Sequence, residues 1–200
     1  MIDILIPTNK PHHKIKRYVE GIQKTVSVDY RITPTCFQVS AAVNRNYALI
    51  QAKSKYVIMI DDDLAGFFSG WADKLLTPLL NSNVIMVSAR LMQTKTKPGA
   101  MMDIPVDMSK SIVESPHGML PSACVAFRND GTRFDENYIG AGFEDTDFCM
   151  QLNHKYYNGM FMIHNEVKLI HKNEMKNQRG GQLQRNQAYY MKKWGLNVKK

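Results

Sequence analysis

The sequence has few cysteines and no long hydrophobic run. The three cysteines, Cys36, Cys124 and Cys149, are odd in number and widely spaced, without a C-x-x-C pair. This pattern argues against a disulfide framework and against a cysteine metal site. No stretch approaches the roughly 18 apolar residues of a membrane helix, and the N-terminus lacks the apolar core of a secretory signal. We therefore expect a cytoplasmic protein, in the host cytoplasm if the source is viral, with no transmembrane segment.

Several phosphate and metal motifs are also absent. The chain contains neither the phosphate loop G-x-x-x-x-G-K-[ST] nor the zinc motif H-E-x-x-H. An EF-hand loop is excluded because Ala65 stands where the motif, which continues with a glycine such as Gly66, requires a third oxygen ligand. The segment 140–145, GAGFED, has only part of the G-x-G-x-x-G pattern and carries acids where a pyrophosphate would approach. A dinucleotide-binding fold is therefore not expected.

Length and charge limit the remaining classes of protein. With 200 residues, 44% of them hydrophobic, the chain is long enough for one well-packed domain. The net charge is +8, and from Lys172 to the C-terminus there are eight Lys or Arg residues against one acid. A basic tail suits a polyanionic partner such as DNA, but a solvated terminus explains it equally well.

Hydrophobic periodicity alternates between strand and helix, which predicts an α/β domain with a mostly parallel central sheet flanked by helices. The expected strands are residues 2–6, 30–33, 56–60, 84–89, 122–128, 160–163 and 167–170. The expected helices start near Pro11, Ser40, Trp71 and Glu144, and a final amphipathic helix ends at YYMKKWG. Residues 92–121 carry four prolines, two glycines and no sustained period, which predicts an irregular, mobile insertion. We expect this insertion to act as a lid without a stable element of its own.

Three consecutive aspartates, Asp61, Asp62 and Asp63, follow the apolar strand 56–60, and a helix-forming segment is expected after them. In α/β sheets, ligands bind at the carboxyl ends of parallel strands. Neighbouring carboxylates repel and raise one another's pKa values, so a cluster without compensation costs stability. A divalent cation removes this cost, and carboxylate oxygens suit Mg²⁺ or Mn²⁺. The alternative is a solvated strand end that also caps the next helix.

Five segments in chain order resemble those of the family 2 glycosyltransferases, which have the GT-A fold. They are IPTNK (6–10), NRNYALIQAKSKYVIMIDDDL (44–64), GAGFEDTDFCMQL (140–152), IHKNE (170–174) and NQAYYMKKWG (186–195). The resemblance implies a single GT-A (nucleotide-diphospho-sugar transferase) domain over residues 1–200. Residues 1–90 would form the nucleotide-sugar-binding half and residues 122–200 the acceptor and catalytic half, with 92–121 inserted between them.

The same resemblance assigns roles to individual residues. Asp63 and His171 would bind Mn²⁺ or Mg²⁺, although a lone histidine is also common as a structural residue. Asp145 would be the general base of an inverting transfer and Glu144 would orient the acceptor, while Asp147 faces solvent or braces its helix. Acids in the first turn of a helix can also serve only as caps. Contacts with the nucleotide sugar are implied for Pro7, Thr8, Asn9, Arg45, Asp61, Asp62 and Gly142.

The implied reaction is the metal-dependent transfer of a sugar from a nucleotide-diphosphate donor to a hydroxyl of an acceptor. A UDP-sugar is the expected donor. The acceptor would be a glycan or a hydroxymethylated base in DNA, and the enzyme a hexosyl- or pentosyltransferase. Two departures leave the nucleobase and the acceptor contacts open: residues 33–38 contain no carboxylate where the family reads uracil, and Gln151 stands where an arginine is common.

Two other functions compete with this interpretation. A sugar nucleotidyltransferase shares the fold, but its glycine-rich first loop is missing from residues 7–14, PTNKPHHK. A nucleic-acid-binding module without catalysis would account for the basic charge and for Tyr189, Tyr190 and Trp194 in the tail. Those aromatic residues have helical spacing, which favours packing against the core.

Overall fold

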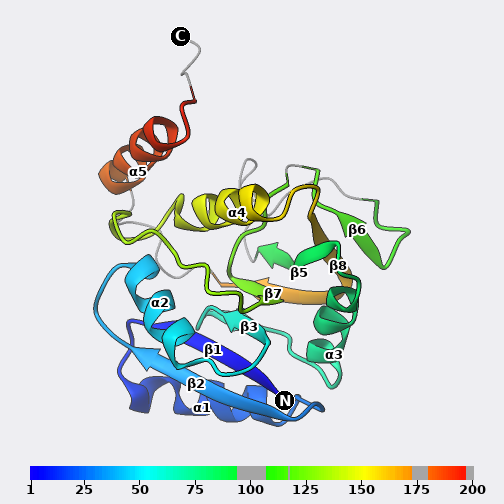
Figure 1. Cartoon of the computed structure of the whole chain (residues 1–200). Helices are drawn as coiled ribbons and strands as arrows, with labels where there is room; N and C mark the ends of the chain where they lie inside the picture. The colour runs from blue at the N-terminus through cyan, green and yellow to red at the C-terminus, as the bar shows by residue number, and fades with distance from the viewer. Residues whose placement is uncertain (94–106, 117, 173–179, 197–200) are drawn as a thin grey trace.

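The computed structural model describes residues 1–93, 107–116, 118–172 and 180–196. An eight-stranded sheet carries helices on both faces (Figure 1). The strands are β1 (Ile2–Thr8), β2 (Tyr30–Cys36), β3 (Tyr56–Ile60), β4 (Leu64–Ala65), β5 (Val84–Gln93), β6 (Ile112–Glu114), β7 (Cys124–Arg128) and β8 (Met160–His171). The helices are α1 (His12–Gln23), α2 (Ala41–Gln51), α3 (Trp71–Leu76), the short 3-10 helix η1 (Thr77–Leu80), α4 (Glu144–Lys155) and α5 (Gly180–Lys193). No helix within these ranges is long and apolar enough to cross a membrane.

The sheet is mixed, with the larger share of its paired positions parallel. The strand order is β2-β1-β3-β7-β5-β8-β4, and β6 pairs with β8 off this path. β1 runs parallel to β2 and β3, and β5 runs parallel to β8. β7 is antiparallel to both of its neighbours, β3 and β5. The predicted α/β fold with a mostly parallel sheet is confirmed, and the carboxyl ends of β1, β2 and β3 meet at one edge.

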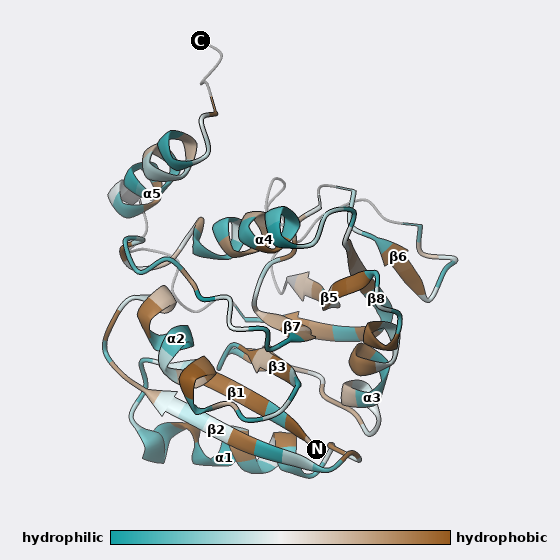
Figure 2. Ribbon diagram, viewed as in Figure 1, coloured by the Kyte–Doolittle hydropathy of each residue, from teal (hydrophilic) through white to brown (hydrophobic). Residues whose placement is uncertain are grey.

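Alternate side chains of β3 enter two separate hydrophobic cores. Ile58 and Ile60 pack in the core that is covered by α1 and α3. Val57 and Met59 pack in the core that is covered by α2 and α4. Figure 2 shows the consequence: the central strands are mostly hydrophobic, whereas the outer helices α1 and α5 are largely hydrophilic. An apolar strand without alternation is typical of a sheet covered on both faces, so the pattern at 56–60 was interpreted correctly.

Three predicted elements were wrong. β8 is one continuous strand where two were expected, and a register shift opposite Ala89 and Arg90 lets it follow β5 over its length. The short strand β4, not a helix, follows the three aspartates and pairs with the end of β8. The insertion 92–121 contains β6, which pairs with β8, so the expectation that it has no stable element was also wrong. Residues 94–106 and 117 of the predicted lid lie outside the described residues.

Candidate active site

A cleft of about 280 Å³ opens where β1 and β3 end and where α2 and α5 begin. Most of the predicted site residues line it. Three of the predicted site residues, Gly142, Glu144 and Asp145, do not line the cleft. They come directly after Gly140 and Ala141 of the lining, in the last loop residues and first turn of α4. The lining consists of Pro7, Thr8, Asn9, Val39, Ala41, Asn44, Arg45, Asp61, Asp62, Asp63, Gly140, Ala141, His171 and Gln182.

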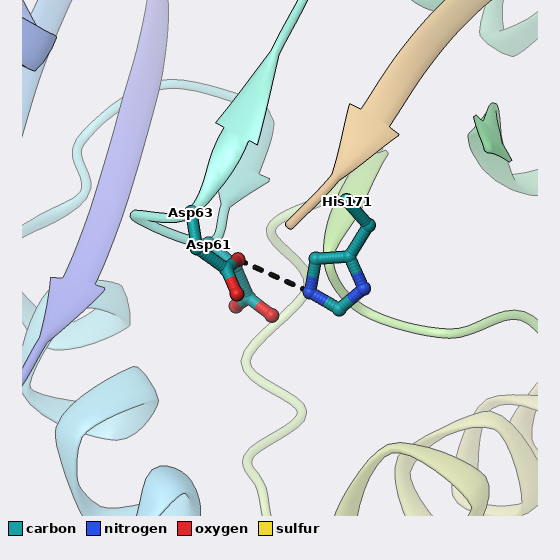
Figure 3. A group of neighbouring side chains, drawn as sticks. All are labelled: Asp61, Asp63 and His171. Atoms are coloured by element: carbon teal, nitrogen blue, oxygen red, sulfur yellow. Dashed lines mark ion pairs between the residues drawn. The ribbon is translucent and has the colours of Figure 1, made fainter. Parts of the chain in front are cut away.

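Asp61, Asp63 and His171 form a group of three side chains that could hold a metal ion (Figure 3), and all three line this cleft. One ligand atom from each residue lies within 4.8 Å of the other two. His171 Nε2 is 3.1 Å from Asp63 Oδ1. The pairing of β4 with the end of β8 brings these distant segments together, since Leu64 lies opposite His171 and the Lys172 N–H donates to the Asp63 carbonyl at 3.0 Å.

The charges around Asp61 fit a divalent cation. Burial raises the pKa of Asp61, Arg45 opposes this shift, the Asp63 charge adds to it, and His171 lowers it. Two carboxylates and one imidazole form a donor set that suits Mn²⁺, whereas Mg²⁺ prefers oxygen ligands alone. Two ligands of one such ion, each at about 2.1 Å, are at most about 4.2 Å apart. A spread within 4.8 Å therefore needs only a small inward movement of the side chains.

Asp62 belongs to a different set of contacts. It accepts a short hydrogen bond from the Thr8 hydroxyl, and Lys10 Nζ lies 3.2 Å from its Oδ1. The Lys10 N–H in turn donates to Thr8 Oγ1 at 3.0 Å. Asp62 thus fixes the loop after β1, which carries Asn9, against the loop after β3.

Arg45 is buried between two carboxylates. Only 7% of it is exposed, because α2 turns it toward the cleft. Arg45 Nη1 is 2.6 Å from Glu144 Oε1, and Nη2 is 3.3 Å from Asp61 Oδ1. Thr8, Arg45 and Asp61, which were expected to meet at the nucleotide, do line one cleft.

Asp145 stands in the first turn of α4 after a tight entry loop. Gly140 and Gly142 have φ values of 68° and 114°, and Phe143 is left-handed at 69°. The Asp145 Oδ1 accepts a hydrogen bond from the Thr146 N–H at 2.8 Å. Burial, followed by the Glu144 charge, raises the pKa of Asp145 to about 6, against the lowering effect of Arg45. A carboxylate with this pKa is ionised at neutral pH and is a stronger base than an ordinary aspartate.

Asp147 does not face solvent, so that part of the prediction was wrong. It is fully buried, and its carboxylate accepts hydrogen bonds from Tyr138, Gln151, Lys193 and Trp194. Lys193 and Trp194 belong to the C-terminal segment that contains α5, so Asp147 fastens that segment to α4. Its role as a brace extends beyond its own helix.

Sequence reasoning missed Asn186. This residue of α5 is 1% exposed, and its amide accepts from the Ile139 N–H at 3.1 Å and donates to the carbonyls of Ile139 at 3.0 Å and Gly142 at 2.9 Å. It therefore shapes the loop that forms one wall of the cleft. The only signal was its helical spacing with the buried Tyr190, four residues later.

Comparison with known proteins identifies the fold. No protein-family model matches the chain, and no curated protein matches it. Among solved structures, a crystal structure of GalNAc-T7 with UDP, GalNAc and Mn²⁺ matches with a TM-score of 0.71 at 11% identity, over 96% of this chain and 47% of that one. TarS of S. aureus (residues 1–349) matches with 0.56 at 13% identity, over 86% and 60%. A mycobacterial protein matches with 0.65 at 14% identity, over 99% and 76%.

These likenesses show the class of fold. The domain has the GT-A fold, as the sequence predicted. The chain spans about half the length of the GalNAc-T7 structure and three fifths of the TarS structure.

Proposed function

We propose that this protein is a metal-dependent glycosyltransferase of the family 2 type, which moves a sugar from a nucleotide-diphosphate donor to a hydroxyl of an acceptor. The observation that carries the proposal is the cleft in which Asp61, Asp63 and His171 converge beside Arg45. Residues 1–90 supply most of the donor side of this cleft, and residues 122–200 supply the start of α4 and the wall formed with α5. Other enzymes share this fold, so the chemistry of the cleft is the decisive argument.

The donor side suits a diphosphate held through a divalent cation. Asp61, Asp63 and His171 would hold the ion, for which Mn²⁺ is the first choice because one of the three ligands is an imidazole. When bound, such an ion supplies Lewis-acid neutralisation of the negative charge on the leaving diphosphate. Pro7, Thr8 and Asn9 would contact the nucleotide. The GalNAc-T7 structure contains UDP and Mn²⁺, which supports a UDP-sugar as the first donor to test.

The acceptor side suits an inverting displacement. The Asp145 carboxylate would accept the proton of the acceptor hydroxyl while that oxygen bonds to the anomeric carbon. The bond from the anomeric carbon to the diphosphate oxygen breaks on the opposite side, and its electron pair leaves with the nucleoside diphosphate. One transfer of this kind inverts the anomeric configuration. The pKa of Asp145, raised to about 6, supports this carboxylate as the general base.

Two acceptors are proposed, a glycan and hydroxymethylated DNA. The exposed residues Lys14, Lys16 and Arg17 lie in the first half of α1, which begins just after Asn9 of the cleft. No acidic residue occupies the first turn of this helix. A positive surface beside a catalytic cleft supports an anionic acceptor such as DNA. A neutral glycan would also lose its hydroxyl proton to Asp145, but it would not need contact with this positive surface.

A donor screen tests the proposal. Hydrolysis of nucleotide sugars is measured with Mn²⁺, with Mg²⁺ and with a chelator, followed by transfer to glycan acceptors and to hydroxymethylated DNA. We expect metal-dependent release of nucleoside diphosphate, fastest with a UDP-sugar and Mn²⁺. A sugar nucleotidyltransferase would instead form pyrophosphate from a nucleoside triphosphate and a sugar phosphate. Nucleic-acid binding without turnover of any donor would favour the non-catalytic module.

A further inference from the structure

Arg45 connects two parts of the chain that are far apart in sequence. Its guanidinium contacts Asp61, which follows β3, and Glu144, the first residue of α4. The guanidinium carbon also lies 5.4 Å from the centre of the Phe134 ring, and Phe134 itself is buried. Arg45 is therefore held on several sides and joins the metal-binding group to the start of the catalytic helix.

Both oxygens of Glu144 are occupied within the protein. Oε1 pairs with Arg45 at 2.6 Å, and Oε2 accepts a short hydrogen bond from the Gly142 N–H. The Glu144 side chain is 4% exposed. These contacts leave it poorly placed to orient an acceptor, which the family resemblance implied. They place it well to hold the entry loop and first turn of α4, where Asp145 is the next residue.

We propose that Arg45 is a positioning residue which, through Glu144, holds the Asp145 carboxylate at a fixed place relative to the Asp61 side of the metal-binding group. This inference rests on the proposed transferase function and adds to the expected contact of Arg45 with the nucleotide. Burying two carboxylates and one guanidinium has a high desolvation cost, so such a group adds little net stability. A role in fixing the positions of its members explains it better. A planar guanidinium presents several donors in a rigid fork, whereas a lysine ammonium is a point charge on a flexible stem.

Two conservative variants test the role of Arg45. Arg45→Lys keeps the positive charge but loses the rigid bridge, and Glu144→Gln keeps the size of the side chain but loses the charge that Arg45 holds. Glu114→Gln is the matched control, because it makes the same chemical change at an exposed position of β6. For each protein we would measure kcat, the donor KM, the Mn²⁺ affinity and the urea midpoint.

We expect each bridge variant to lower kcat by roughly 10²-fold, the usual effect of displacing a catalytic group by about 1 Å. The donor KM and the Mn²⁺ affinity should change by less than about threefold in Glu144→Gln, because Asp61 and Asp63 remain intact. The double variant should be no slower than the slower single variant, since both changes break one connection. A purely structural ion pair would instead lower the urea midpoint and leave kcat per folded molecule unchanged, which would overturn the proposal.

A second readout does not depend on turnover. The carboxyl ¹³C signal of Asp145 is titrated in the metal-free protein. The charged groups that act on its pKa are Glu144, Arg45 and Asp61, whereas the Cys149 thiol of α4 stays neutral through this pH range because burial raises its pKa to about 12. We expect a lower midpoint in Glu144→Gln, because the Glu144 charge raises this pKa, and a higher one in Arg45→Lys, because the cation moves away. If the wild type turns over no donor, the proposed function fails, and the titration alone decides on the bridge: identical midpoints in the wild type, Arg45→Lys and Glu144→Gln overturn it.

Discussion

Replacement of Asp145 by asparagine should remove most of the transferase activity from a protein that stays folded and still binds its donor. Asparagine is nearly the same size as aspartate, and its Oδ1 can still accept the hydrogen bond from the Thr146 N–H. Its amide cannot take up a proton at neutral pH. A general base contributes about 10²–10⁴-fold, so we expect kcat to fall by that factor, which corresponds to roughly 3–5 kcal/mol of activation free energy.

The pKa of Asp145 gives this prediction a pH dependence. In the wild type, burial and the Glu144 charge raise this pKa from 3.8 to about 6. The active base is the ionised form, so kcat/KM should rise with pH through about 6 and level off above about 7. Because the folded pKa exceeds the ordinary value, this group costs the wild type stability as pH rises from about 4 to about 6. Asp145→Asn carries no such cost and should unfold in urea at the same or a higher concentration at pH 7.5.

The assay measures release of nucleoside diphosphate and formation of the glycosylated product for the wild type, Asp145→Asn and the control Asp29→Asn. Asp29 is a suitable control because its side chain is 78% exposed and lies 3.8 Å from the N-terminal amine. Donor affinity should stay within about threefold in both variants. Turnover of Asp145→Asn near the wild-type rate, or an acid limb near pH 6 that persists in this variant, would refute the assignment of the base. A product with retained anomeric configuration would refute the inverting mechanism.

Three further predictions follow from the same site. Asp63→Ala should abolish the Mn²⁺-dependent part of UDP-sugar binding in calorimetry; equal wild-type affinity with Mn²⁺ and with a chelator would remove the metal role. Asp147→Asn should lower the free energy of unfolding by about 2–4 kcal/mol in urea titrations, because it weakens buried charge-assisted hydrogen bonds, and an unchanged midpoint would contradict its role as a brace. Asn186→Leu should speed hydrogen exchange at the Ile139 N–H and raise the donor or acceptor KM, whereas the exposed control Gln184→Leu should change neither.

The strand before the aspartates and the position of the cleft could be predicted because local patterns determine them. A short apolar run without alternation specifies a strand covered on both faces, and charge directly after it specifies an accessible strand end. The convergence of Asp61, Asp63 and His171 needed more than local pattern, because β4 and β8 bring the histidine to the aspartates. The family resemblance supplied that long-range pairing of Asp63 with His171.

The burial of Arg45 and Asp147 could not be predicted from local pattern. A charged residue on a helix usually faces solvent, and only its partners reveal that it does not. Arg45 and Glu144 are 99 residues apart, and Asp147 and Trp194 are 47 apart. Periodicity indicates which face of a helix is polar. It does not indicate that a side chain of another element, such as the Lys193 ammonium or the Trp194 indole, contacts that face. The burial of Arg45 and Asp147 therefore follows from partners that compensate their charge over a long distance along the chain.

The three consecutive aspartates illustrate how such compensation allows like charges to accumulate at the end of a buried strand. Asp61 meets the guanidinium of Arg45, Asp62 meets the Thr8 hydroxyl and the Lys10 ammonium, and Asp63 meets the His171 imidazole. Each carboxylate thus has a different partner from a different segment, and Asp62 is bound apart from the other two. What remains is the repulsion between Asp61 and Asp63, which adds to the effect of burial in raising the pKa of Asp61. A divalent cation bound as proposed would relieve that residual repulsion, so the fold compensates most of the cluster by itself and would leave only the last part of the compensation to the ion.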